Sequence, residues 1–224
     1  MPCEPTEPMA KLVFDSLNQH YNHTLDFVEF FDTGSTARVF HVRMPVSREL
    51  EMKVDRIVKV FRHDGDVIPH EEALAAYLQE IKSLISISHT NIISVYSAGA
   101  LQVTDEVRSN FYVMEYLPGA CDFDKWIRDH AENLRPDDII DLLLQAAWGL
   151  KALHRVNILH CDIKFGNLLV GSDRRLKIAD LGFSKEIRGG EGDTAVHTTL
   201  EGLPNKYRSF IEKLSDPRRT LVRI

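Results

Sequence analysis

The sequence predicts an α+β fold in which a small antiparallel sheet comes first and helices dominate the rest. Three observations lead to this prediction. Short β-branched and aromatic runs follow one another from Asp26 onward, one amphipathic helical pattern comes after them, and a long apolar helical pattern fills part of the second half. With 224 residues, of which 44% are apolar, the chain can bury a substantial core. We expect a globular protein of one domain, or of one domain and part of another.

The first 24 residues differ in amino-acid composition from the rest of the chain. Residues 1–24 are polar and carry three prolines, which indicates a flexible N-terminal extension. Beyond them, DFVEFF, ARVFHVR and VDRIVKVF are strand-like runs separated by turn residues, as expected for neighbouring antiparallel strands.

A helix is predicted over residues 71–86, where apolar side chains recur every three or four positions. Glu80 lies at the edge of this apolar stripe, so we expect its carboxylate to have a cationic partner. Further strands are predicted around residues 92–95 and 111–116, and Leu117-Pro118-Gly119 then interrupts the pattern as a linker does.

Two helices are predicted in the second half of the chain. A short one covers about 123–132 and a longer one 136–154, where Pro136 suits the first helical turn. The longer helix is apolar on nearly all sides, which is typical of a helix buried in the centre of a domain. Short strands are predicted on both sides of residues 160–170, in ILHCD and in LLVG or LKIAD.

The amino-acid composition indicates which binding partners and which cellular compartment to expect. The chain has 27 Lys plus Arg against 33 Asp plus Glu, a net charge of −6, so we expect neither nucleic acid nor an anionic membrane as a partner. Its three cysteines have no paired short spacing, and the N-terminus has no apolar segment of the signal-peptide kind. We expect a soluble protein of the cytoplasm or nucleus.

The run HCDIKFGNLLV at residues 160–170, followed by Asp180-Leu181-Gly182, is the most informative part of the sequence. It combines an acid that can accept a hydroxyl proton, a lysine that can neutralise a phosphate, and two oxygen donors that suit Mg²⁺. This combination is what phosphoryl transfer requires.

Other motifs accompany this run in a fixed order: RIVKVF, LQEIKSL, SHTNII, MEYLPG and KIADLG. On these motifs the chain resembles the eukaryotic-type protein kinases from about Asp26 to Lys185. The resemblance implies a two-lobe fold, an N-terminal antiparallel sheet plus one long helix and then a helical C-lobe. The kinase-like domain would cover 25–224, with an N-lobe at about 25–115, a hinge at 115–119 and a partial C-lobe at 120–224.

The resemblance also assigns catalytic roles. Asp162 would orient the substrate hydroxyl and accept its proton, and Lys164 would steady the transferring phosphate. Asn167 and Asp180 would hold magnesium ions (Mg²⁺). A lysine two residues after the catalytic aspartate is typical of serine/threonine kinases, so a protein serine or threonine is the expected acceptor.

For the nucleotide, the resemblance pairs Lys59 with Glu80, and the lysine would grip the α- and β-phosphates of ATP. Met114 would guard the adenine pocket, and residues 115–117 of the hinge would bind adenine through backbone groups. The residues expected to contact ATP are Gly34, Val39, Ile57, Lys59, Met114, Glu115, Leu117 and Leu169.

Three features depart from the family pattern. Of the three glycines expected over the phosphates, DTGSTARV keeps only Gly34, which predicts weaker nucleotide binding. Ile57 replaces a small alanine and could overpack the adenine slot by about 1 to 3 kcal/mol. The chain also ends soon after the motif region, so we expect a C-terminally truncated C-lobe that leaves one apolar face of helix 136–154 to be covered by a partner or a second copy.

Three functions are compatible with this sequence. The first is an ATP-dependent serine/threonine protein kinase whose activity the missing part of the C-lobe could impair. The second is a non-catalytic kinase-like (pseudokinase) interaction module, favoured by the altered glycine pattern. The third is a small-molecule phosphotransferase, although the D-I-K and K-I-A-D-L-G stretches resemble protein kinases more closely.

Overall fold

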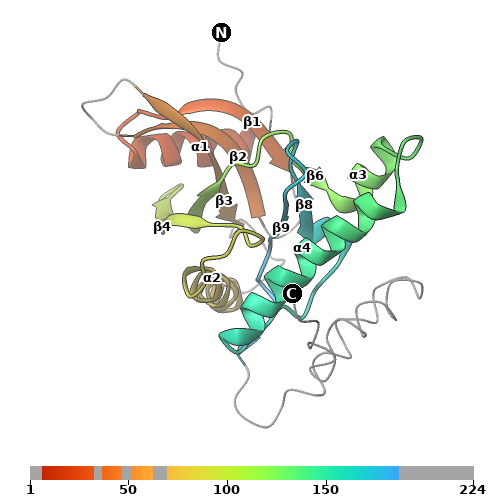
Figure 1. Cartoon of the computed structure of the whole chain (residues 1–224). Helices are drawn as coiled ribbons and strands as arrows, with labels where there is room; N and C mark the ends of the chain where they lie inside the picture. The colour runs from red at the N-terminus through yellow and green to blue at the C-terminus, as the bar shows by residue number, and fades with distance from the viewer. Residues whose placement is uncertain (1–6, 33–36, 47–51, 63–69, 187–224) are drawn as a thin grey trace. The chain divides into compact units, whose positions relative to one another are not determined.

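The computed structural model of the chain describes residues 7–32, 37–46, 52–62 and 70–186. It divides into two compact units (Figure 1). Of the residues that the structure describes, those up to 85 and those at 94–116 form the N-terminal unit, and 86–93 and 117–186 form the C-terminal unit. Among the described residues, no helix is long and apolar enough to cross a membrane.

The N-terminal unit is built on one antiparallel sheet, which confirms the sheet predicted from the strand-like runs. The strand predicted around residues 92–95 lies at Val95–Gln102 instead. The spatial order of the sheet is β1-β2-β3-β5-β4. The strands are β1 (Asp26–Asp32), β2 (Ala37–Pro45), β3 (Lys53–Phe61), β4 (Val95–Gln102) and β5 (Arg108–Glu115). The central strand β3 pairs with β2 on one side and with β5 on the other.

Side chains alternate between the two faces of this sheet, because successive residues of a strand point in opposite directions. One face carries the apolar residues of the main core, which are all at most 2% exposed: Phe40, Val42, Val58, Val60, Phe111 and Val113. The residues between them, including Val39, Lys59 and Tyr112, therefore lie on the opposite face.

Helix α1 (Pro8–His20) covers the apolar face, which corrects the prediction of a flexible extension over residues 1–24. Ala10, Val13, Phe14 and Leu17 recur at helical spacing and are buried against the core residues of the sheet. The prolines near the N-terminus do not prevent a helix here, because Pro8 occupies the start of α1, where proline is well tolerated. Residues 1–6 lie outside the described part of the chain.

Helix α2 (His70–Ile85) confirms the helix predicted over residues 71–86. Its side chains meet the face opposite α1: the ring of Tyr77 packs edge-on against Phe61, and the carboxylate of Glu80 contacts Lys59. The two helices of the N-terminal unit therefore lie on opposite faces of the sheet.

The C-terminal unit combines helices with short strands. Its helices within residues 117–186 are α3 (Phe123–Asp129), α4 (Pro136–Arg155) and the 3-10 turn η1 (Phe165–Asn167). A three-stranded sheet has the order β6-β8-β9, and a two-stranded sheet pairs β10 with β7. The strands are β6 (Cys121–Asp122), β7 (Ile158–Leu159), β8 (Leu168–Val170), β9 (Leu176–Ile178) and β10 (Lys185–Glu186).

Helix α4 packs closely on strand β9 and on the segment around Asn91. A Cβ at Gly149 would lie 2.8 Å from the backbone oxygen of Asn91 and 2.8 Å from the side chain of Ile178. The prediction of a helix buried on nearly all sides is only partly correct, because Ile140 and Trp148 of α4 are 41% and 55% exposed. Whether a partner or a second copy covers these side chains stays a prediction.

Candidate active site

Lys59 occupies the centre of the N-terminal sheet. In the register of the strands it lies opposite Val39 of β2 and opposite Tyr112 of β5. A residue in the middle strand of a paired sheet has little backbone freedom, so the start of the lysine side chain is fixed by the ladders on both sides.

The side chain of Lys59 forms an ion pair with Glu80, which confirms that this carboxylate has a cationic partner. Its Nζ lies 2.9 Å from Oε1 and 3.1 Å from Oε2 of Glu80. Glu80 is 1% exposed and the lysine side chain 13%, so solvent screens the pair little. Both residues belong to the N-terminal unit.

Several residues predicted to contact the nucleotide share the sheet face of Lys59. Val39 lies directly across from it, and Ile57 on the same strand pairs with Met114 of β5. Glu115 follows Met114, and its carboxylate accepts a hydrogen bond from the backbone N–H of Ser94 at 2.7 Å. The backbone N–H of Glu115 donates in turn to the backbone oxygen of Ser94 at 3.0 Å, so both groups tie Glu115 to Ser94 within the N-terminal unit.

The other predicted nucleotide contacts fall elsewhere. Leu117 and Leu169 belong to the C-terminal unit, where Leu117 is 8% exposed and Leu169 pairs with Asp122 between β8 and β6. Gly34 lies outside the described residues.

Asp162 is the centre of a second group, in the loop between β7 and η1. Its Oδ2 accepts hydrogen bonds from Lys164 Nζ at 2.7 Å and from the side-chain nitrogen of Asn167 at 3.1 Å. The same nitrogen of Asn167 also donates to the backbone oxygen of Asp162 at 2.8 Å. The structure thus brings together three of the four residues predicted for the catalytic loop and its metal.

His160 fixes the backbone of this loop. It is 1% exposed, its Nδ1 accepts the backbone N–H of Asp162 at 3.3 Å, and its Nε2 lies 3.3 Å from the backbone oxygen of Ala179. These two partners assign the proton of a neutral imidazole to Nε2, which donates to Ala179. Burial lowers the pKa of His160, although the hydrogen bond to Ala179 opposes this effect, so the ring is held neutral.

Asp180 directly follows Ala179, the residue whose backbone oxygen contacts His160. Its neighbour Ala179 donates its backbone N–H to the backbone oxygen of Asn167 at 2.9 Å, so the chain passes close to Asn167 just before it reaches Asp180. Asp180 adopts a φ of 62°, which is rare for residues other than glycine and recurs at functional positions.

Asn167 and Asp180 fit the ligand chemistry of Mg²⁺. The side-chain nitrogen of Asn167 faces Asp162, which leaves the amide oxygen as the atom available to a metal. Asp180 adds a carboxylate, and magnesium in phosphate sites commonly takes only one or two protein oxygens besides those of the substrate. Within the described part of the chain, no group of three or more His, Cys, Asp or Glu side chains could hold a metal by itself.

Cys161 lies between His160 and Asp162 and also has a positive φ, of 61°. Burial raises the pKa of its thiol, which disfavours the reactive thiolate form. The thiol of Cys161 is therefore not activated as a nucleophile.

Tyr112 is the residue of this site that the sequence did not single out. Its hydroxyl donates to Oε1 of Glu80 at 2.9 Å, and its side chain is 1% exposed. In the sequence it is one of several apolar or aromatic residues of a strand, and only the pairing of β3 with β5 places it beside Lys59.

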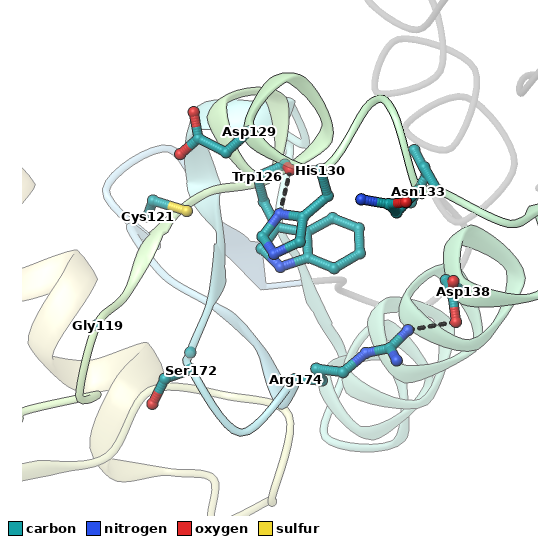
Figure 2. Close-up of a pocket in the computed structure, with 11 residues that line it drawn as sticks. Gly119, Cys121, Trp126, Asp129, His130, Asn133, Asp138, Ser172 and Arg174 are labelled. Atoms are coloured by element: carbon teal, nitrogen blue, oxygen red, sulfur yellow. Dashed lines mark hydrogen bonds and ion pairs between the residues drawn. The ribbon is translucent and has the colours of Figure 1, made fainter.

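A separate cavity of about 500 Å³ lies between α3, the start of α4 and the turn that joins β8 to β9. Figure 2 shows the stacked rings of Trp126 and His130 in this cavity, and the ion pair of Arg174 with Asp138. None of the catalytic or metal-binding candidates lines it.

Comparison with known proteins identifies the kind of domain that carries these residues. The sequence profile described as "Protein kinase domain" matches residues 33–205, which is more than half of the chain. The match includes every predicted site residue.

Individual relatives are protein kinases of several kinds. The chain is 29% identical over 149 residues to mitogen-activated protein kinase kinase kinase 5 of Arabidopsis thaliana, covering 65% of this chain and 20% of that protein. It is 30% identical over 141 residues to the tyrosine-protein kinase Fer of Rattus norvegicus, covering 63% and 16%. It is 38% identical over 111 residues to the serine/threonine-protein kinase atg1 of Dictyostelium discoideum, covering 48% and 16%.

The matched relatives include both serine/threonine and tyrosine kinases, so they do not distinguish the acceptor. The chain spans a fifth or less of the length of these three curated relatives.

Proposed function

Because this chain belongs to the protein kinase family, we propose that it transfers the γ-phosphoryl group of ATP to a serine or threonine hydroxyl of a protein substrate. The observation that carries this proposal is the geometry of Asp162, whose Oδ2 is held by Lys164 and Asn167. Both contacts use the same oxygen, so Oδ1 remains for the proton of the substrate hydroxyl.

The proposed reaction uses each residue in a defined way. The substrate oxygen forms a bond to the γ-phosphorus while the bond from that phosphorus to the β,γ-bridging oxygen breaks, and ADP leaves. The hydroxyl proton passes to Oδ1 of Asp162. Lys164, which pairs with Asp162 at 2.7 Å, lies close enough to neutralise charge on the transferring group.

Lys59 supplies a second positive charge for the phosphates. Because Glu80 holds its ammonium at two oxygens, the cation is fixed in direction before a nucleotide binds. Asn167 and Asp180 would hold Mg²⁺, which when bound neutralises the charge that develops on the phosphates.

The serine/threonine preference rests on Lys164. A lysine two residues after the catalytic aspartate is the pattern of that branch of the family, and the structure has its ammonium on Asp162. The amino acid that accepts the phosphate therefore needs its own measurement.

The experiment is a transfer assay with labelled ATP, Mg²⁺ and three peptide pools that differ only in whether serine, threonine or tyrosine is the acceptor. We expect label on serine and threonine, and a rate about 10² to 10⁴-fold lower for Asp162→Asn, because that change removes the proton acceptor. Label on tyrosine alone would overturn the preference for serine and threonine.

A non-catalytic interaction module is the alternative, favoured by the loss of two expected glycines around Gly34. A measurement of nucleotide binding distinguishes an active kinase from a non-catalytic module. ATP at 100 times its Kd should stabilise the folded protein by about 2.7 kcal/mol, which a thermal-shift titration detects. No shift with ATP and no transfer to any pool would favour the interaction module.

A further inference from the structure

Tyr112 contacts both members of the ion pair between Lys59 and Glu80. Its hydroxyl donates to Oε1 of Glu80 at 2.9 Å, the oxygen that also accepts from Lys59 at 2.9 Å. The ammonium of Lys59 in turn lies 5.7 Å from the centre of the Tyr112 ring and 5.2 Å from that of Phe61, within the range of cation–π attraction.

The burial of this group makes the hydroxyl important. Glu80 and Tyr112 are each 1% exposed, so water cannot readily replace a missing donor to the carboxylate. The donor also comes from strand β5, which is paired on both sides within the sheet, whereas Glu80 is carried by helix α2. The hydroxyl therefore ties the helix carboxylate to the rigid part of the N-terminal unit.

We propose that Tyr112 is a positioning residue for nucleotide binding. By fixing Oε1 of Glu80, its hydroxyl holds the Lys59 ammonium in one place before ATP arrives, which lowers the entropy lost on binding. This inference rests on the proposed function, because it concerns how the lysine receives the phosphates.

The variant Tyr112→Phe removes one oxygen and keeps the ring. Its matched control is Tyr77→Phe, because Tyr77 is 6% exposed, packs on the same Phe61 ring, and donates its hydroxyl to the backbone oxygen of Phe111 at 3.2 Å instead of to Glu80. Thermal unfolding of both variants checks that they fold.

Kinetics with ATP as the varied substrate give the first readout. We expect Tyr112→Phe to lower kcat/KM for ATP about tenfold, mainly through KM, because a hydrogen bond to a buried charge is lost. Tyr77→Phe should keep the wild-type kcat/KM, even if it unfolds at a lower temperature. Equal kinetic losses in both variants, or none in Tyr112→Phe, would overturn the proposal.

A double-mutant cycle tests whether Tyr112 acts through Glu80. In the background of Glu80→Ala the change Tyr112→Phe should cause no further loss of kcat/KM, because the carboxylate that it positions is gone. Additive losses would show that the hydroxyl acts by another route and would contradict the proposal.

Labelling of Lys59 without nucleotide separates this inference from the proposed function. An amine-acylating reagent followed by mass spectrometry measures how tightly the ammonium is held, and Tyr112→Phe should be labelled at Lys59 several-fold faster than wild type or Tyr77→Phe. If wild type transfers no phosphate but this difference appears, the proposed function fails and the positioning of Lys59 stands. If wild type is active and labelling is the same in all three proteins, the role of Tyr112 is wrong.

Discussion

The side-chain nitrogen of Asn167 holds Asp162 at two points, donating to its backbone oxygen at 2.8 Å and to its carboxylate at 3.1 Å. One amide therefore orients the proton acceptor with its nitrogen and leaves its oxygen for a metal. Asn167 is only 6% exposed, so this orientation is maintained by the surrounding protein.

Because the amide of Asn167 serves both Asp162 and the metal, we predict two separable effects of Asn167→Ala. We expect the Mg²⁺ concentration for half-maximal activity to rise about tenfold or more, as when other groups that support a metal site are removed. We also expect a lower kcat at saturating Mg²⁺, because Asp162 loses two of its contacts. Transfer rates measured across a Mg²⁺ titration give both quantities.

Asn133→Ala is the matched control for this change, since Asn133 is exposed and lies outside the catalytic loop. It should leave both the Mg²⁺ dependence and kcat unchanged. An Asn167→Ala protein with the wild-type Mg²⁺ requirement would remove Asn167 from the metal site.

Helix α1 should contribute strongly to stability. Leu17 is 0% exposed against the sheet, so we expect Leu17→Ala to lower the free energy of unfolding by about 2 to 5 kcal/mol. Leu12 of the same helix is 46% exposed, and Leu12→Ala should have a much smaller effect. Urea denaturation curves compare the two, and similar losses would mean that α1 is not packed as described.

The contact of α4 with the segment around Asn91 predicts that Gly149→Ala is destabilising. The added methyl group would lie 2.8 Å from a backbone oxygen, which cannot move as easily as a side chain. We expect a loss of about 1 to 3 kcal/mol in the free energy of unfolding. At Gly166 a Cβ would meet nothing within 4 Å, so Gly166→Ala should show no such loss in the same denaturation measurement.

His160 predicts a specific pH dependence of stability. Burial lowers its pKa below 6.5, its value when unfolded, so between the two values the unfolded chain binds more protons than the folded one. The contribution of His160 to stability is therefore complete above pH 6.5 and declines as the pH falls through that value.

The measurement is the free energy of unfolding of wild type and His160→Gln between about pH 7.5 and 5, above the range in which most carboxylates titrate. Wild type should lose stability more steeply toward low pH than the variant. Parallel curves would show that His160 does not remain neutral in the folded protein.

The sequence was sufficient to predict four of the five strands of the sheet, helix α2 and a cationic partner for Glu80, whereas the strand predicted around residues 92–95 lies at Val95–Gln102. Each of these depends on local information: alternation in the strands, helical spacing, and the position of one carboxylate at the edge of an apolar stripe. That the partner of Glu80 is Lys59 was implied only by the resemblance to protein kinases. The motif around Asp162 was equally local, and the structure brings Lys164 and Asn167 onto it.

The features that the sequence did not reveal depend on contacts between distant segments. The role of Tyr112 depends on the register that sets it opposite Lys59, and an aromatic residue in an apolar run gives no sign of that register. Helix α1 was missed for a different reason. Ala10, Val13, Phe14 and Leu17 recur at helical spacing, but the prolines at residues 2, 5 and 8 are equally typical of a flexible segment.

The packing of α1 shows that the hydrophobic core and the recognised kinase region do not begin at the same residue. The profile of the protein kinase domain begins to match at residue 33, while the hydrophobic core of the N-terminal unit already includes Ala10. Helix α1, which precedes the residues matched by the profile, thus covers one side of the core. Without this helix, Phe40, Val58 and Phe111 would be exposed to water. The hydrophobic core of the N-terminal unit therefore begins earlier in the chain than the region by which the family is recognised.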